Sequence, residues 1–177
     1  MSPERLGDLS VIGDRLLGED QARARMPGRR RRGPAGRAAG DLLLHPMWIA
    51  WSDVLAERPP FRTAVRPSVI FVDAVSEYRG LLASVPHTQV LDGREVQVHR
   101  ATVTRARARE LVTDVQQSQI NRTYLLRKPR HELRRLELSH LPVWRFDPRG
   151  GAPVAYVNAV SGADESYLAG RWGAPPA

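Results

Sequence analysis

The chain has 177 residues, a length that suits one domain or two very small ones, and we predict a single shared core. The composition is 42% hydrophobic and 26% charged, as in folded proteins, while 14 glycines and 14 prolines argue against an architecture of long unbroken helices. The net charge of +8 favours polyanionic partners, and the lack of cysteine excludes disulfides, thiolate metal sites and cysteine catalysis.

Residues 1–40 are predicted to form an N-terminal helix followed by a basic, flexible arm. Leu6, Leu9, Ile12 and Leu16 have spacings close to a helical apolar stripe. From Gln21 to Gly40 the sequence is rich in Arg, Gly and Pro and has almost nothing to bury. We therefore expect a linker or arm in this range.

Residues 41–86 are predicted to form a first structural copy with two strands. The apolar run at 42–51 and the β-branched run at 69–72 are typical of strands. The intervening residues 52–67 contain three prolines and predict a long loop.

Residues 87–177 are predicted to form a second copy. Asp92-Gly93 indicates a hairpin turn, and Thr104 is a candidate N-cap for a helix that runs to about Arg122. Alternating apolar residues at 136–146 predict a strand, which a turn joins to a returning strand at 154–157.

The two copies share a sequence pattern. Phe71-Val72-Asp73-Ala74-Val75-Ser76 returns as Tyr156-Val157-Asn158-Ala159-Val160-Ser161, and Pro46-Met47-Trp48 returns as Pro142-Val143-Trp144. Such repetition indicates duplication. We predict an α+β fold in which two tandem helix/β-hairpin units share a mostly antiparallel sheet with helices on one face.

The order of elements, ending on Val157-Asn158-Ala159-Val160-Ser161-Gly162, resembles the PepSY type of bacterial repeat domain. The resemblance covers residues 100–165 and, more loosely, 41–80, where Glu77 replaces the glycine. It implies a non-catalytic bacterial module, and no functional residue is carried over from it.

No catalytic, cofactor-binding or metal-binding residue is predicted. The five histidines lack ligand spacing, and neither Ser76 nor Ser161 lies in a nucleophile elbow. Asp73 and Asn158 are expected to hold the turns that follow their strands, or to converge on a ligand across a pseudo-two-fold axis. The four tryptophans are interpreted as core residues or, alternatively, as stacking platforms for a base or a sugar.

Basic clusters give the candidate polyanion-binding residues. These are Arg29, Arg30, Arg31 and Arg32 in the arm, and Arg105, Arg107 and Arg109 in the predicted helix. A further group lies between Arg127 and Arg135. Lys128 is the only lysine among 27 basic residues, so GC-rich codon usage is the alternative explanation.

We therefore predict a non-enzymatic interaction or scaffold module of a bacterial protein assembly, with a protein partner or self-association. The alternative is an accessory nucleic-acid-binding protein that uses the arginine-rich arm. The N-terminus lacks the features of a signal peptide, and the run at 42–51 is shorter than the roughly 20 residues that a spanning helix needs. A cytoplasmic location with no transmembrane segment is expected.

Overall fold

The computed structural model describes residues 7–26, 39–93, 96–147 and 153–172. The strands are β1 (Asp8–Ile12), β2 (Gly40–Arg58), β3 (Phe61–Asp73), β4 (Arg79–Leu82), β5 (Thr88–Asp92), β6 (Gln97–Val98), β7 (Arg130–Phe146) and β8 (Ala155–Asn158). The helices are α1 (Glu19–Ala24), α2 (Arg105–Val115) and α3 (Ser166–Ala169). A π-helical turn, Gln116–Ile120, and a 3₁₀ turn, Asn121–Thr123, extend α2.

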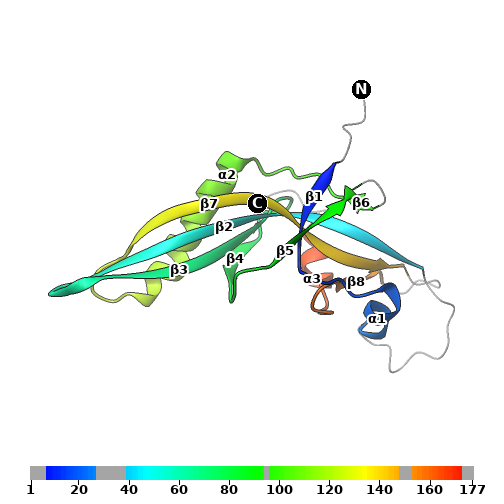
Figure 1. The fold of residues 1–177 in the computed structure, drawn as a ribbon, viewed down its shortest axis with the longest axis horizontal. Coiled ribbons are helices and arrows are strands. Elements are labelled where there is room, and N and C mark those ends of the chain that lie inside the picture. Colours follow the sequence, from blue (N-terminus) through cyan, green and yellow to red (C-terminus); the bar gives the residue numbers. More distant parts are fainter. Residues whose placement is uncertain (1–6, 27–38, 94–95, 148–152, 173–177) are drawn as a thin grey trace.

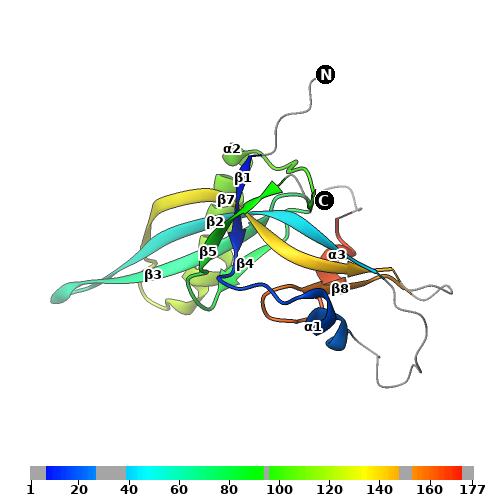
Figure 2. The same ribbon diagram turned by 45° about the vertical axis from the view of Figure 1, so that its right-hand side comes forward.

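The described residues form one mixed sheet of eight strands around the β2–β7 pair (Figure 1). The main order is β4-β3-β2-β7-β1-β5, with β6 paired to β2 and β8 paired to β7. The pairs β1–β7 and β2–β6 are parallel, whereas the other pairs are antiparallel. The β2–β3 hairpin projects beyond the rest of the sheet at one end of the molecule (Figures 1 and 2).

The predicted fold of two tandem helix/β-hairpin units is wrong. Strands make up 47% of the structure and helices 21%, and the helices are short. The physical reason is the length of β2 and β7, which pair from Gly40–Phe146 to Leu55–Arg130 and so join both halves of the chain into one sheet.

Helix α2 covers the core on one face of the sheet. Thr104 caps it as predicted, since its hydroxyl accepts a hydrogen bond from the backbone N–H of Arg107 at 3.2 Å. Its buried side chains recur at helical spacing and pack against Ala50, Ile70 and Val72 of the sheet. These buried side chains are Ala108, Leu111, Val112 and Val115. This apolar face fixes α2 against β2 and β3.

Helix α1 packs against the other end of β7. Its Ala22 is fully buried beside Phe146 and Val157, with Trp144 at the edge of the same cluster. The segment expected to be an arm from Gln21 onward therefore begins inside a packed helix. Of the earlier apolar stripe, Leu9 and Ile12 lie on a strand rather than a helix, because β1 pairs with both β5 and β7, while Leu6 lies outside the described residues.

Two other local predictions need correction. Residues 52–67 belong to the β2–β3 hairpin rather than to a long loop, and Pro67 lies opposite Asp53 where β4 no longer pairs with β3. A proline is tolerated there because its missing N–H faces an open edge. Asp92-Gly93 does not join a hairpin, since β5 pairs with β1 and β6 pairs with β2.

Candidate binding site

Asp73 and Asn158 each hold the turn that follows their own strand. Asp73 Oδ1 accepts hydrogen bonds from the N–H groups of Val75 (2.8 Å) and Ser76 (3.0 Å). Asn158 Oδ1 accepts bonds from the N–H groups two and three residues further on, at 2.9 and 3.0 Å. These bonds support the turn-stabilising interpretation.

The tryptophans near these turns also have matching environments. Trp48 lies opposite Val72 and donates its indole N–H to the carbonyl of Val103 at 2.9 Å. Trp144 lies opposite Val157 and donates to the carbonyl of Leu17 at 2.8 Å. Each ring packs against a hydrophobic core cluster. The internal repeat itself stays a prediction.

Asp73 has a second role that the sequence reasoning missed, because it forms a buried pair with His45. Both side chains have zero solvent exposure, and His45 Nε2 lies 2.9 Å from Asp73 Oδ1. Burial by itself raises the pKa of Asp73, but the hydrogen bond and charge of His45 and the two turn N–H groups bring it below its usual range. The ionised carboxylate only accepts, so His45 Nε2 is the donor.

His99 extends this pair toward the surface. Its Nδ1 lies 3.1 Å from Nδ1 of His45, so one of these two atoms carries the shared hydrogen. Burial, followed by the electrostatic effect of His45, lowers the pKa of His99 below its ordinary value, and the nearby Asp73 opposes this shift. His99 is therefore disposed to remain neutral in the folded protein.

Trp172 covers the histidine–aspartate pair from the C-terminal segment. Its ring stacks on His45 with 4.0 Å between centroids and a 15° interplanar angle. Its indole N–H donates to Asp73 Oδ2 at 3.2 Å, and Tyr156 makes an edge contact at 5.4 Å. We name His45, Asp73, His99 and Trp172 the polar cluster.

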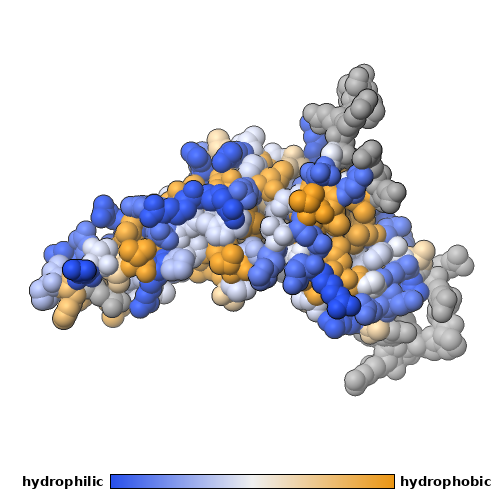
Figure 3. Space-filling view, in the orientation of Figure 1, coloured by the Kyte–Doolittle hydropathy of each residue, from blue (hydrophilic) through white to orange (hydrophobic). Residues whose placement is uncertain are grey.

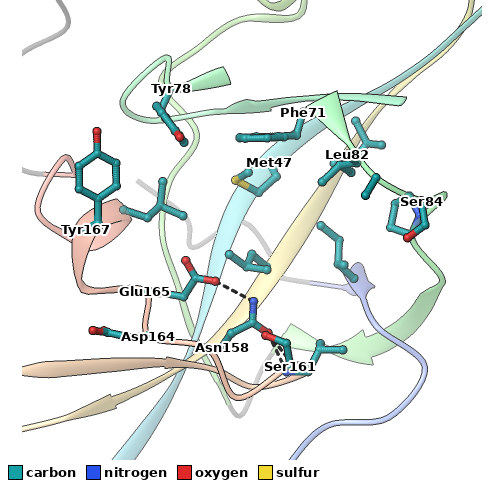
Figure 4. Close-up of a pocket in the computed structure, with 17 residues that line it drawn as sticks. Met47, Phe71, Tyr78, Leu82, Ser84, Asn158, Ser161, Asp164, Glu165 and Tyr167 are labelled. Atoms are coloured by element: carbon teal, nitrogen blue, oxygen red, sulfur yellow. Dashed lines mark hydrogen bonds between the residues drawn. The ribbon is translucent and has the colours of Figure 1, made fainter. Parts of the chain in front are cut away.

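An apolar pocket of about 460 Å³ lies on the same face of the sheet as the polar cluster, and Figure 4 shows the residues that line it. His45 and Met47 are two residues apart on β2, so they share one face of the sheet, and Met47 lines the pocket. The main apolar lining residues are Ile12, Met47, Ile49, Phe71, Leu82 and Leu141. This size and lining are typical of sites that bind an apolar group.

The polar end of the pocket includes Asn158, Ser161, Asp164 and Glu165 (Figure 4). The Asn158 side-chain amide donates to Glu165 Oε1 at 2.8 Å. Burial raises the pKa of Glu165 above its ordinary value, with a smaller contribution from Asp164, while the Asn158 bond and His45 oppose the change. A carboxyl group that resists ionisation therefore lies at the edge of an apolar space.

Replacing Glu165 by glutamine should stabilise the fold by on the order of 1 kcal/mol at neutral pH, because the amide keeps an acceptor for Asn158 and removes a half-buried charge. A raised folded-state pKa means that Glu165 stabilises the fold below its unfolded pKa and loses this contribution as pH rises through the folded value. The extra stability of Glu165→Gln over the parent should therefore disappear in acid. Urea unfolding of both proteins across pH measures it, and a less stable variant at neutral pH would contradict the assignment.

The serines near the site also take part in turns. Ser76 Oγ accepts from the N–H of Tyr78 at 3.4 Å, and Ser161 Oγ accepts from the N–H of Ala163 at 3.2 Å. No group of three or more His, Cys, Asp or Glu side chains suited to a metal ion occurs among the described residues.

The predicted polyanion-binding residues are only partly described. Arg29 to Arg32 lie outside the described residues. Arg105 and Arg109 are exposed on α2, whereas Arg107 forms ion pairs with Glu77 and Glu110, each at 2.8 Å. The charge of Arg107 is therefore matched within the protein.

The chain matches no family model, no curated protein and no solved structure. The resemblance to PepSY domains thus stays a prediction. Across the described parts of the chain, no helix is both long and apolar enough to span a membrane.

Proposed function

We propose that the chain is a non-enzymatic interaction module that binds a partner polypeptide and accepts one of its apolar side chains in the pocket. The observation that carries this proposal is the pocket itself. It is open, about 460 Å³ in volume and mainly apolar, with the Asn158–Glu165 pair at its polar end. Such a lining favours the binding of an apolar group that a few polar contacts orient.

The strand next to the pocket supports a polypeptide as the occupant. In the described sheet β4 is the terminal strand beyond β3, and its backbone groups face outward along that edge. Tyr78, Leu82 and Ser84, which lie just before β4, at its last residue and just after it, also line the pocket. A partner strand added along β4 would therefore place a side chain near the pocket entrance.

Peptide selection on the immobilised full chain tests the proposal. We expect displayed random peptides that bind to share an apolar anchor residue. Ala83 is exposed and lines the pocket, so Ala83→Trp should fill the entrance and weaken these peptides by at least about tenfold. Isothermal titration with the synthesised peptides gives the affinities.

Val85→Trp is the matched control, because Val85 is exposed in the same loop but is absent from the pocket lining. This variant should bind the peptides as the parent chain does. Selected peptides that bind Ala83→Trp as tightly as Val85→Trp would overturn the proposal.

A further inference from the structure

The projecting end of the molecule exposes large apolar side chains. Phe61 is 76% exposed at the start of β3, and Val65 on the same strand is 55% exposed. Leu125 and Leu126, in the segment that precedes β7, are 94% and 98% exposed. In Figure 3, hydrophobic residues lie among strongly hydrophilic ones toward this end.

The two leucines are exposed on a segment that is fixed at several points. Tyr124 packs against the core cluster under α2. Lys128 Nζ donates to the carbonyls of Asn121 and Tyr124 at 3.0 and 2.8 Å. Arg127 lies 3.6 Å from Glu57 of β2, which ties the segment to the hairpin. Leu125 and Leu126 are thus held outward between anchored neighbours.

Positive charge surrounds these apolar side chains. The segments 55–67 and 121–132 contain seven basic residues and two acidic ones, Glu57 and Glu132. Glu57 is shared by Arg127 and Arg130, while Glu132 lies 2.9 Å from Arg134 of β7. The acidic groups are therefore already paired, and the local field is positive.

We propose that this end, formed by the β2–β3 hairpin and residues 121–130, docks on an anionic phospholipid surface. Leu125, Leu126 and Phe61 enter the interfacial region, and the arginines and Lys128 contact the lipid phosphates. Both features fit one partner, because a lipid interface is apolar just below a layer of negative charge. A nucleic acid would bind to the positive charge, but its binding would not be strengthened by two outward-facing leucines.

Vesicle sedimentation with the full chain tests the proposal, using phosphatidylcholine vesicles with and without phosphatidylglycerol. We expect binding to the anionic vesicles that weakens with salt. The double variant L125S/L126S keeps the charge and should lose about tenfold in affinity. R62E/R66E should also lose about tenfold or more, because it reverses the charge of two exposed hairpin arginines that take no part in anchoring the leucine segment.

Leu81→Ser and Val90→Ser are matched controls, since both side chains are exposed but lie on β4 and β5. They should bind vesicles like the parent chain, as should the pocket variant Ala83→Trp. Equal binding by L125S/L126S and the parent chain would overturn the proposal, as would equal binding to neutral vesicles. Duplex DNA binding that R62E/R66E abolishes and L125S/L126S leaves intact, without vesicle binding, would identify a nucleic-acid surface instead.

Discussion

Replacing Asp73 by alanine should lower the free energy of unfolding by about 3–5 kcal/mol at neutral pH. The substitution leaves the fully buried His45 without its carboxylate partner. It also removes the acceptor for the N–H groups of Val75 and Ser76 and for the indole of Trp172. Urea unfolding followed by circular dichroism measures the loss.

Asn158→Ala is the control, because Asn158 makes the same two backbone contacts at its own turn. It should cost only about 1–3 kcal/mol, since no buried histidine depends on it. The lowered pKa of Asp73 means that its stabilisation is present above the unfolded pKa and is lost as pH falls through the folded value. The difference in free energy of unfolding between the parent and Asp73→Ala should therefore shrink in acid. Equal losses of stability in Asp73→Ala and Asn158→Ala would contradict the role of the buried pair.

Replacing Trp172 by alanine should cost about 3 kcal/mol, because its large ring covers His45 and its N–H satisfies Asp73. Trp172→Phe should recover most of this loss, since a phenyl ring still stacks on His45 while only one hydrogen bond is removed. Thermal and urea unfolding of both variants measure the two effects. Equal stability of Trp172→Ala and the parent would show that the C-terminal segment does not close the polar cluster.

Local patterns predicted the central strands and the main helix. The apolar run at 42–51 lies within β2, the run at 69–72 lies within β3, and Thr104 caps α2. The pairing of β7 with β8 also follows the predicted order. These elements could be predicted because their side-chain periodicity and their caps are local properties of the sequence.

The sheet order could not be predicted, because it depends on contacts between distant segments. Nothing near residues 8–12 indicates that β1 pairs with β5 and β7, and these pairings override a weak helical stripe. Likewise, the three prolines at 52–67 are typical of a loop. The sequence does not show that β4 ends before it reaches Pro67, which leaves an open edge where a proline is tolerated.

One feature of the sequence indicates the polar cluster. His45 lies inside the otherwise apolar run at 42–51, and a buried polar side chain requires a hydrogen-bonding partner. Its partners lie at positions 73, 99 and 172, so no spacing rule connects them. The sequence does not indicate the pocket for the same reason, since Met47, Leu141 and Glu165 come together only in the folded protein.

The most direct test of whether a partner side chain enters the pocket is methyl NMR of the full chain labelled at methionine. The chain has three methionines, of which Met47 lines the pocket and Met26 packs beside α1 in a separate cluster. Addition of a selected peptide should shift the Met47 methyl resonance and leave that of Met26 unchanged. A peptide that binds without moving Met47 would show that the partner does not enter the pocket.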